Sequence, residues 1–326
     1  MSSRVIVALG GNALWADGQR GTWGQQLANA TKAARGVVEL QRAGYRVVLT
    51  HGNGPQVGAL SLQQSAGEAE VPPMPFDVLV AMTQGHSGFL LATAISAIDP
   101  TLATATVMTR VRVRGDDPAF ESPAKPIGIF YDEATARRFA TERGWAIGPD
   151  AGRGWRRLVP SPQPIDIVEL EQIRLLSDSG ALVIAVGGGG VPVIKGPGGL
   201  RGCDAVIDKD RASAELARLL DADLLMLVTG VPRVALDFGT RWQRDMSRLT
   251  VTDATRHLKE GEFPAGSMGP KIESAARFVL AGGRAAIVTQ IDRMAEAVAG
   301  RDGTWIVPDS EGPSIVAPSI ESTVAA

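Results

Sequence analysis

Residues 5–12 read VIVALGGN, and this short apolar run ending in glycine decides the fold class. Five consecutive apolar residues are typical of a strand covered by helices on both faces. Similar runs occur at 46–50, 181–186, 224–229 and 285–289, and each ends in a glycine or polar turn. Helix-like patterns lie at 24–43, 78–97, 132–143, 168–179, 211–220 and 270–281. This alternation predicts a doubly wound α/β sheet.

Two stretches interrupt the alternation. Residues 110–165 are rich in Arg, Gly and Pro, and we interpret them as an inserted, irregular subdomain, although a pair of long loops fits the same composition. From Asp309 onward the chain lacks aromatic residues and is rich in Ser, Ala and Pro. We therefore expect a single domain over residues 1–308, with a subdomain at about 110–165 and a flexible C-terminal tail at 309–326.

The overall composition excludes several classes of protein. The chain has 326 residues and a formal net charge of -2, and no basic run of the kind found in nucleic-acid-binding proteins. A single cysteine excludes an internal disulfide, and three histidines far apart in sequence argue against a zinc site. The first 14 residues resemble neither a signal peptide nor a membrane span. We expect a soluble, cytoplasmic protein that binds neither nucleic acid nor membrane.

The glycine-rich turns predict where a ligand binds. Ligands of open α/β sheets lie beyond the carboxyl ends of the strands, and the turns at 10–11, 52–54, 187–190 and 230 all follow predicted strands. Glycine lets the backbone approach a ligand closely, and free N–H groups at helix starts favour anions. Four such turns on one sheet edge favour phosphate or nucleotide binding.

The common nucleotide motifs do not account for these turns. No lysine follows a glycine, which excludes a Walker A loop. The turn that starts at Gly52 has one residue too many for the dinucleotide fingerprint, which disfavours a dinucleotide oxidoreductase. Asp237-Phe238-Gly239 matches the magnesium-binding triplet of protein kinases, but the chain has no His-Arg-Asp catalytic loop, so the match is attributed to chance.

Lysine is scarce enough to be inspected residue by residue. Of 33 basic residues only six are lysines: Lys32, Lys125, Lys195, Lys209, Lys259 and Lys271. Lys209 opens a predicted helix, where either Asp208 or Asp210 can hold its ammonium. Lys271 follows Pro270 at another helix start, where a cation is locally unfavourable unless an anionic ligand offsets the cost.

The other lysines are weaker candidates. Lys125 lies in the irregular insertion, where an exposed loop lysine and a functional one are equally consistent with the sequence. Lys32, Lys195 and Lys259 are interpreted as solvated. Lysines held by aspartate beside glycine turns, with no cysteine, histidine or serine nucleophile, favour direct phosphoryl transfer, in which positioning and charge stabilisation supply the catalysis.

The same motifs resemble those of carbamate kinases, in the amino acid kinase family. The resemblance rests on residues 7–14, 50–58, 152–155, 161–164, 187–192, 205–210 and 266–271, and it extends from about residue 4 to about 307. It implies a three-layer α/β/α sandwich around a mostly parallel open sheet with a small protruding subdomain, and a homodimer. The implied reaction, part of arginine metabolism, is reversible transfer between ATP and carbamate. In the catabolic direction ADP and carbamoyl phosphate give ATP and carbamate, which yields CO₂ and ammonia.

The resemblance also implies roles for particular residues. Lys209 and Lys271 would flank the transferring phosphoryl group, Asp210 would orient them, and Lys125 would reach in from the protruding subdomain. Substrate and phosphoryl contacts would come from Gly10, Gly11, Asn12, Gly52, Asn53 and Gly54. Nucleotide contacts would come from Gly230, Val231, Val234, Ala265, Gly266, Ser267 and Met268. Mg²⁺ would accompany ATP or ADP and be held mainly by the phosphates, without a protein metal site.

Two alternatives stay open, and the sequence departs from the family pattern in places. The chain could phosphorylate another small carboxylate, in which case the acceptor site would have room for a side chain. It could also be a catalytically silent, nucleotide-binding regulator, although Lys209, Asp210 and Lys271 together argue against that. Gly230 replaces a common aspartate, which puts a nucleotide contact in doubt, and Phe76 replaces a common methionine, which we interpret as a packing change.

Overall fold

A central sheet of parallel strands organises the molecule. The computed structural model describes residues 3–150, 154–264 and 266–310. Within this part the main sheet has eight strands, and all neighbours are parallel except β16 and β17. Its order is β15 (Arg248–Thr250), β17 (Thr304–Val307), β16 (Ala285–Gln290), β12 (Leu224–Thr229), β1 (Arg4–Leu9), β2 (Arg46–His51), β9 (Leu182–Ile184) and β3 (Thr104–Thr106).

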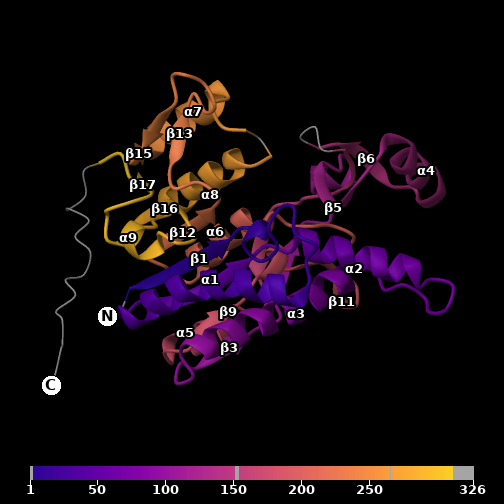
Figure 1. The fold of residues 1–326 in the computed structure, drawn as a ribbon, viewed down its shortest axis with the longest axis horizontal. Helices are drawn as coiled ribbons and strands as arrows, with labels where there is room; N and C mark the ends of the chain where they lie inside the picture. The colour runs from indigo at the N-terminus through magenta and orange to yellow at the C-terminus, as the bar shows by residue number, and fades with distance from the viewer. Residues whose placement is uncertain (1–2, 151–153, 265, 311–326) are drawn as a thin grey trace.

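Helices cover both faces of this sheet, because successive strand side chains point to opposite sides. Val5, Val7 and Leu9 pack in one core with α1 (Trp23–Arg42), α3 (Phe76–Ile98) and α9 (Met294–Val298). Ile6 and Ala8 pack in the other core with α5 (Leu170–Asp178), α6 (Lys209–Leu219), α7 (Val251–Glu260) and α8 (Met268–Leu280). The predicted three-layer sandwich is confirmed, and Figure 1 shows its layers.

Two smaller sheets extend this framework. One has the order β11 (Gly199–Gly202), β10 (Val191–Gly196), β4 (Arg110–Val113) and β8 (Pro164–Ile167). The other pairs β13 (Val234–Leu236) with β14 (Arg244–Met246). The sequence pattern indicated neither sheet, because the strands are short and several carry charged or glycine residues.

The protruding subdomain is regular rather than irregular. Its antiparallel sheet has the order β5 (Lys125–Tyr131), β7 (Trp155–Val159) and β6 (Ala146–Pro149), and α4 (Glu133–Arg143) connects β5 to β6. It stands apart from the main body in Figure 1. The prediction of an irregular insertion was wrong, because arginine–aromatic stacking adds to a small apolar core here. Arg157, for example, lies 5.0 Å from the ring centroid of Trp145 and 5.1 Å from that of Phe76.

The subdomain is joined to the body through α2 (Gly54–Ala66), a helix that the sequence analysis missed. A Cβ atom at Gly58 would lie 2.2 Å from Cα of Gly128 in β5, so glycine is needed where the two backbones meet. Phe76, Ile127 and Val159 share a small apolar core at this junction. The place of Phe76 in that core agrees with its interpretation as a packing change.

The helix α3 is unusually apolar for its length. By length and composition alone it could cross a membrane, but 56% of its most apolar window is buried inside the structure. Leu90, Leu91 and Ile95 are fully buried against α1 and the sheet. The helix therefore serves as a core element of the sandwich, and its outer face carries exposed apolar residues.

Candidate active site

The glycine turns lie together at one edge of the main sheet. The strands β12, β1, β2 and β9 are consecutive neighbours, and all four run in the same direction. Leu9 is paired with both His51 and Val228, so the turns that follow these strands begin at the same level. The predicted convergence of the glycine turns is confirmed.

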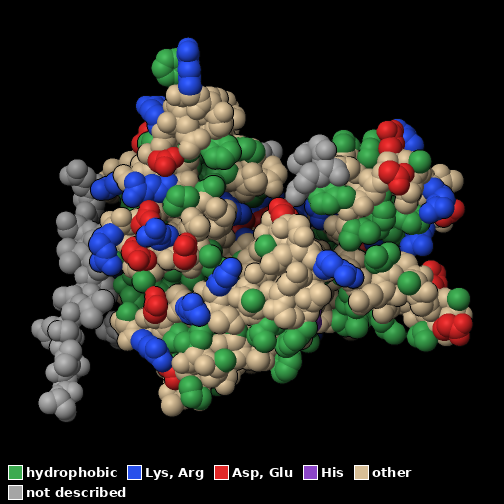
Figure 2. Space-filling view, viewed as in Figure 1, with side chains coloured by type: hydrophobic (Ala, Val, Ile, Leu, Met, Phe, Trp, Pro, Cys, Tyr) green, Lys and Arg blue, Asp and Glu red, His purple; other side chains and the backbone are tan. Residues whose placement is uncertain are grey.

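A cavity of about 180 Å³ lies at this edge, and we call it the lysine cavity. Lys125, Lys209 and Lys271, which are far apart in sequence, all line this cavity. Figure 2 shows the hollow above it, between the protruding subdomain and the part that carries α7 and α8. Its walls include Gly11, Gly52, Asn53, Gly54, Lys125, Gly188, Asp208, Lys209, Asp210, Gly266, Ser267 and Lys271.

Asp210 bridges two of the lysines. Its Oδ1 accepts from Lys209 Nζ at 2.5 Å and its Oδ2 from Lys271 Nζ at 3.1 Å. The Asp210 side chain is 4% exposed and both lysines are 13% exposed, so the three charges are shielded from water. One carboxylate therefore fixes two ammonium groups that come from different helices.

Asp208 has a separate role. Its Oδ1 accepts from the backbone N–H groups of Asp210 and Arg211 at 2.9 and 3.3 Å and caps α6. Its Oδ2 pairs with Lys125 Nζ from the protruding subdomain. The sequence left open which aspartate holds Lys209, and the structure assigns that role to Asp210.

Burial and pairing set the pKa values of this cluster. Burial lowers the pKa of the Lys209 ammonium below its ordinary value, although Asp210 opposes the shift. Burial alone would raise the pKa of Asp210, but Lys209 and Lys271 hold it below the ordinary value. Burial likewise opposes ionisation of Asp208, and Lys125 overcomes it and lowers that pKa. Both carboxylates are therefore ionised at neutral pH. Counted by formal charge, three lysines against two aspartates give the cavity a net positive charge.

Part of the cavity wall is built by glycines packed around Asn53. A Cβ atom at Gly188, whose φ is 68°, would lie 2.3 Å from Nδ2 of Asn53. Nδ2 of Asn53 donates to Oγ1 of Thr83 at 2.8 Å. Gln84 on the same helix donates to the carbonyls of Thr109 and Gly187, both at 3.0 Å. The sequence analysis missed Thr83 and Gln84, and their signal was a polar pair inside an apolar helix.

His51 supports this wall from below. His51 is 1% exposed. A Cβ atom on Gly187 would lie 2.5 Å from Nε2 of its ring. Nδ1 of the ring lies 3.0 Å from the Gly52 carbonyl oxygen. Burial lowers its pKa to about 4, so the ring is neutral at pH 7 and Nδ1 donates to that carbonyl. His51 is therefore a buried structural residue under the cavity.

The predicted nucleotide residues are only partly brought together. Gly266 and Ser267 line the lysine cavity, and Met268 packs beside the core. Ala265 lies outside the described residues. Gly230 and Val231 follow β12 at the same sheet edge, while Val234 is fully buried and its amide donates to Thr304 Oγ1 at 2.8 Å.

A second, open cavity of about 420 Å³ adjoins the first. The two share Gly11, Gly54 and Pro126. Asn12 lines this second cavity and donates to Asp17 Oδ2 at 3.2 Å, while Trp15 and Phe130 supply apolar walls. Gly10 lies beside the end of β12, because its Cβ would be 3.4 Å from the Val228 carbonyl oxygen. Gly11 and Gly54 thus border both cavities.

The remaining lysines lie elsewhere. Lys32, Lys195 and Lys259 are exposed on α1, β10 and α7, and none of them lines the lysine cavity. Their interpretation as solvated residues agrees with their positions.

Comparison with known proteins extends over nearly the whole chain. The model of the amino acid kinase family matches residues 3–290. The carbamate kinase of Pyrococcus horikoshii is 45% identical over 316 residues, which cover 94% of this chain and 100% of that protein. The carbamate kinase-like protein YqeA of Escherichia coli is 43% identical over 318 residues, with 94% and 99% covered.

The three-dimensional comparison agrees with these matches. The structure of carbamate kinase from Giardia lamblia bound to AMP-PNP has a TM-score of 0.88 to this chain at 39% sequence identity. The superposition covers 94% of this chain and 99% of that one.

Proposed function

The chain belongs to the amino acid kinase family, and we propose that its function is reversible phosphoryl transfer between ATP and carbamate. The observation that carries this proposal is the convergence of Lys125, Lys209 and Lys271 in one net positive cavity. The same cavity is lined by Gly52, Asn53, Gly54 and Gly188. This arrangement suits a reaction in which a phosphoryl group passes between two oxygen atoms, because fixed cations stabilise its spread negative charge.

In the ATP-forming direction, a terminal oxygen of ADP attacks the phosphorus of carbamoyl phosphate, and the phosphorus–oxygen bond to carbamate breaks. Lys209 and Lys271 neutralise the oxygens of the transferring group, and Asp210 keeps both ammonium groups in place. In the reverse direction the carbamate oxygen attacks the γ-phosphorus and ADP leaves. Asn53 and the Gly52–Gly54 backbone hold the carbamate.

Lys125 closes the site from the protruding subdomain. Its ammonium pairs with Asp208 across the cavity, so it is near the phosphoryl position before substrate binds. A phosphoryl group competes with Asp208 for this cation.

Mg²⁺ neutralises phosphate charge when it is bound with the nucleotide. Among the described residues no group of three or more His, Cys, Asp or Glu side chains is placed to hold a metal ion. The carboxylates of Asp208 and Asp210 already pair with lysines. Because both carboxylates are engaged by lysines, Mg²⁺ would be held mainly by phosphate oxygens and water.

The nucleotide occupies the side of the cavity bounded by Gly266 and Ser267, with Gly230 and Val231 nearby at the end of β12. Apart from its two chain neighbours, no described residue lies within 4 Å of a Cβ built on Gly230, so the common aspartate would fit there. Glycine at this position therefore removes a side-chain hydrogen-bond acceptor beside the nucleotide.

A larger carboxylate is the second candidate acceptor. The adjoining cavity of about 420 Å³ borders the acceptor wall at Gly11 and Gly54, and it has room for a side chain beyond the carboxyl group. Carbamate itself needs only the 180 Å³ lysine cavity. Phosphorylation of N-acylated amino acids in preference to carbamate would favour this second candidate.

We further propose a soluble, cytoplasmic homodimer. Trp23 on α1 and Phe89 on α3 stack with ring centroids 5.8 Å apart, although they are 45% and 64% exposed. Val78 and Met82 continue the same exposed face of α3. A second copy would cover this face. Light scattering tests the proposal, and Phe89→Glu is expected to give monomers.

The decisive assay measures ATP formed from ADP, Mg²⁺ and carbamoyl phosphate. Folded protein that forms no ATP would exclude the carbamate reaction. The Lys271→Ala variant serves as the control for contaminating kinases. A protein that binds nucleotide but transfers no phosphoryl group to any acceptor would instead be a regulator.

A further inference from the structure

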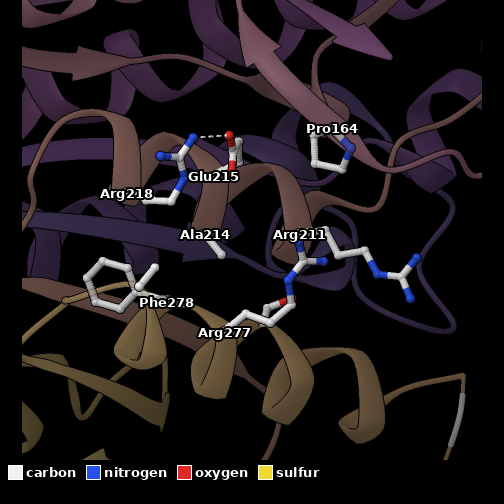
Figure 3. A pocket seen from close by; sticks show the side chains of 9 residues that line it. Pro164, Arg211, Ala214, Glu215, Arg218, Arg277 and Phe278 are labelled. Atoms are coloured by element: carbon white, nitrogen blue, oxygen red, sulfur yellow. Dashed lines mark hydrogen bonds and ion pairs between the residues drawn. The ribbon is translucent and has the colours of Figure 1, made fainter. Parts of the chain in front are cut away.

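A second cationic pocket lies on the outer side of α6 and α8. It is separate from the lysine cavity, has a volume of about 120 Å³, and shares no lining residue with that cavity. Figure 3 shows the pocket between the two helices. We call it the arginine pocket, after Arg211, Arg218 and Arg277.

Helical spacing builds the pocket from two facing stripes. Arg211, Ala214, Glu215 and Arg218 recur at the three- and four-residue spacing that places side chains on one helix face. On α8 the same spacing gives Ser274, Arg277, Phe278 and Ala281, and Pro164 closes one end. The stripes converge on a small space with a polar wall and an apolar edge.

Charge in this pocket is only partly compensated. Arg218 pairs with Glu215 at 2.6 Å, and Arg211 pairs with Glu273 at 2.9 Å. Arg277 donates to the neutral amide oxygen of Gln163 at 3.0 Å and has no carboxylate partner among the described residues. Three guanidinium groups against two carboxylates therefore leave one positive charge in excess.

Two donors in the pocket wall also lack acceptors. Ser274 is 0% exposed, and its Oγ has no hydrogen-bond partner within the described structure. Nε of Arg211 is buried and equally without a partner there. A buried donor without an acceptor is costly, so an acceptor supplied by a ligand would be stabilising.

We infer that the arginine pocket is a second binding site, for a small oxyanion such as a phosphate or a carboxylate group. The volume is well below that of pockets for drug-sized ligands, which suits a single oxyanion. Arg277 supplies the uncompensated charge, and Ser274 and Arg211 supply donors in need of acceptors. Guanidinium groups bind both oxyanions in fork geometry.

The location ties this site to the lysine cavity. Arg211 directly follows Asp210 on α6, and Ser274 lies three residues after Lys271 on α8. The Arg211–Glu273 ion pair joins the two helices beside the Asp210–Lys271 pair. An anion bound to Arg211 would compete with Glu273 for this guanidinium. It would thereby weaken an ion pair that joins α6 to α8, the helices that carry Lys209 and Lys271.

Backbone amide NMR shifts during titration with inorganic phosphate test the inference, because they report each site separately. Phosphate is expected to shift amides at 274–278 and 211–215 saturably. Arg277→Gln is expected to weaken that response at least tenfold and to leave shifts at Gly52–Gly54 unchanged. Arg277 is exposed, and among the described residues its side chain is hydrogen-bonded only to Gln163, so the variant is expected to fold. Arg256→Gln, which removes an exposed arginine of α7, is the matched control.

Acetate provides a second arm of the titration and separates a phosphate site from a carboxylate site. Saturable shifts at 274–278 with either anion, lost in Arg277→Gln, support the inference and identify the ligand class. Absence of shifts at 274–278 with both anions overturns it. An equal response in Arg277→Gln and the unaltered protein also overturns it. These outcomes do not depend on kinase activity, so they are distinct from failure of the proposed function.

Discussion

The lysine cavity and the arginine pocket lie on the same two helices, yet they use different cations. In the lysine cavity a single buried carboxylate holds two ammonium groups that are 13% exposed. In the arginine pocket each paired guanidinium has its own carboxylate, and Arg211 and Arg218 are 24% and 45% exposed. Each region thus has one formal positive charge in excess, but the lysine cavity is buried and the arginine pocket is partly exposed.

This difference shows why the few lysines of the chain are informative. A compact ammonium on a flexible stem fits a narrow buried cavity and can follow a phosphoryl group as it moves. A planar guanidinium is wider and suits fixed recognition of an anion or a surface carboxylate. Substitutions that interchange or remove these groups should therefore have large effects in one region and small effects in the other.

The largest effect is expected from loss of a buried lysine. Lys209→Ala and Lys271→Ala should each lower kcat by ~10²-fold or more, because each removes a cation that stabilises charge in the transition state. The ATP-formation assay measures this effect. Lys195→Ala and Lys259→Ala, at exposed positions, are the controls and should keep nearly full activity.

Acidification should weaken the region under the lysine cavity. Burial lowers the pKa of His51 to about 4, below its unfolded value, so the unfolded chain binds a proton first as the pH falls. Stability from His51 is therefore present above pH ~6.5 and decreases toward pH 4, by about 2 kcal/mol between pH 7 and pH 5.

Urea unfolding at several pH values measures this contribution. His51→Gln keeps a polar side chain but cannot titrate, and it should reduce the loss of stability between pH 7 and pH 5. An identical pH dependence in this variant and the unaltered protein would contradict the assignment to His51.

An intermediate effect is expected from Asp208→Asn. The amide can still cap α6, but it no longer pairs as an ion with Lys125. We expect a decrease of about tenfold in kcat/KM for carbamoyl phosphate, because Lys125 is less well positioned. Steady-state kinetics measure the change in kcat/KM, and thermal unfolding of the same variant shows whether it is less stable. Unchanged kinetics would show that Lys125 does not depend on Asp208.

The smallest effect is expected from Arg211→Lys in the arginine pocket. A lysine can keep the ion pair with Glu273, which is half-exposed, so the free energy of unfolding should fall by no more than ~1 kcal/mol. Activity without added anion should stay within about twofold of the unaltered protein. A tenfold loss of activity would mean that the two regions are not separable.

Much of the framework could be predicted from the sequence. The apolar run at 5–9 and the glycines after it gave the central strand and its ligand-binding edge, and the amino acid kinase resemblance is confirmed by the match over residues 3–290. The strands at 110–113 and 164–167 could not be predicted, because alternating arginines and prolines do not distinguish an edge strand from a loop. The helix α2 was missed for a similar reason, since it begins inside a glycine–proline turn.

The sequence by itself determined the fold class and the short list of cations, because hydrophobic periodicity and residue type act locally along the chain. Only the tertiary structure decided how the charges are paired. Asp208 and Asp210 are two residues apart, yet one faces Lys125 across the cavity and the other faces Lys209 and Lys271. The arginine pocket likewise exists only because α6 and α8 pack side by side. Lys209 and Asp210 are neighbours in sequence, but the other two pairs join residues 83 and 61 positions apart, and those distances are fixed by packing of the whole sandwich.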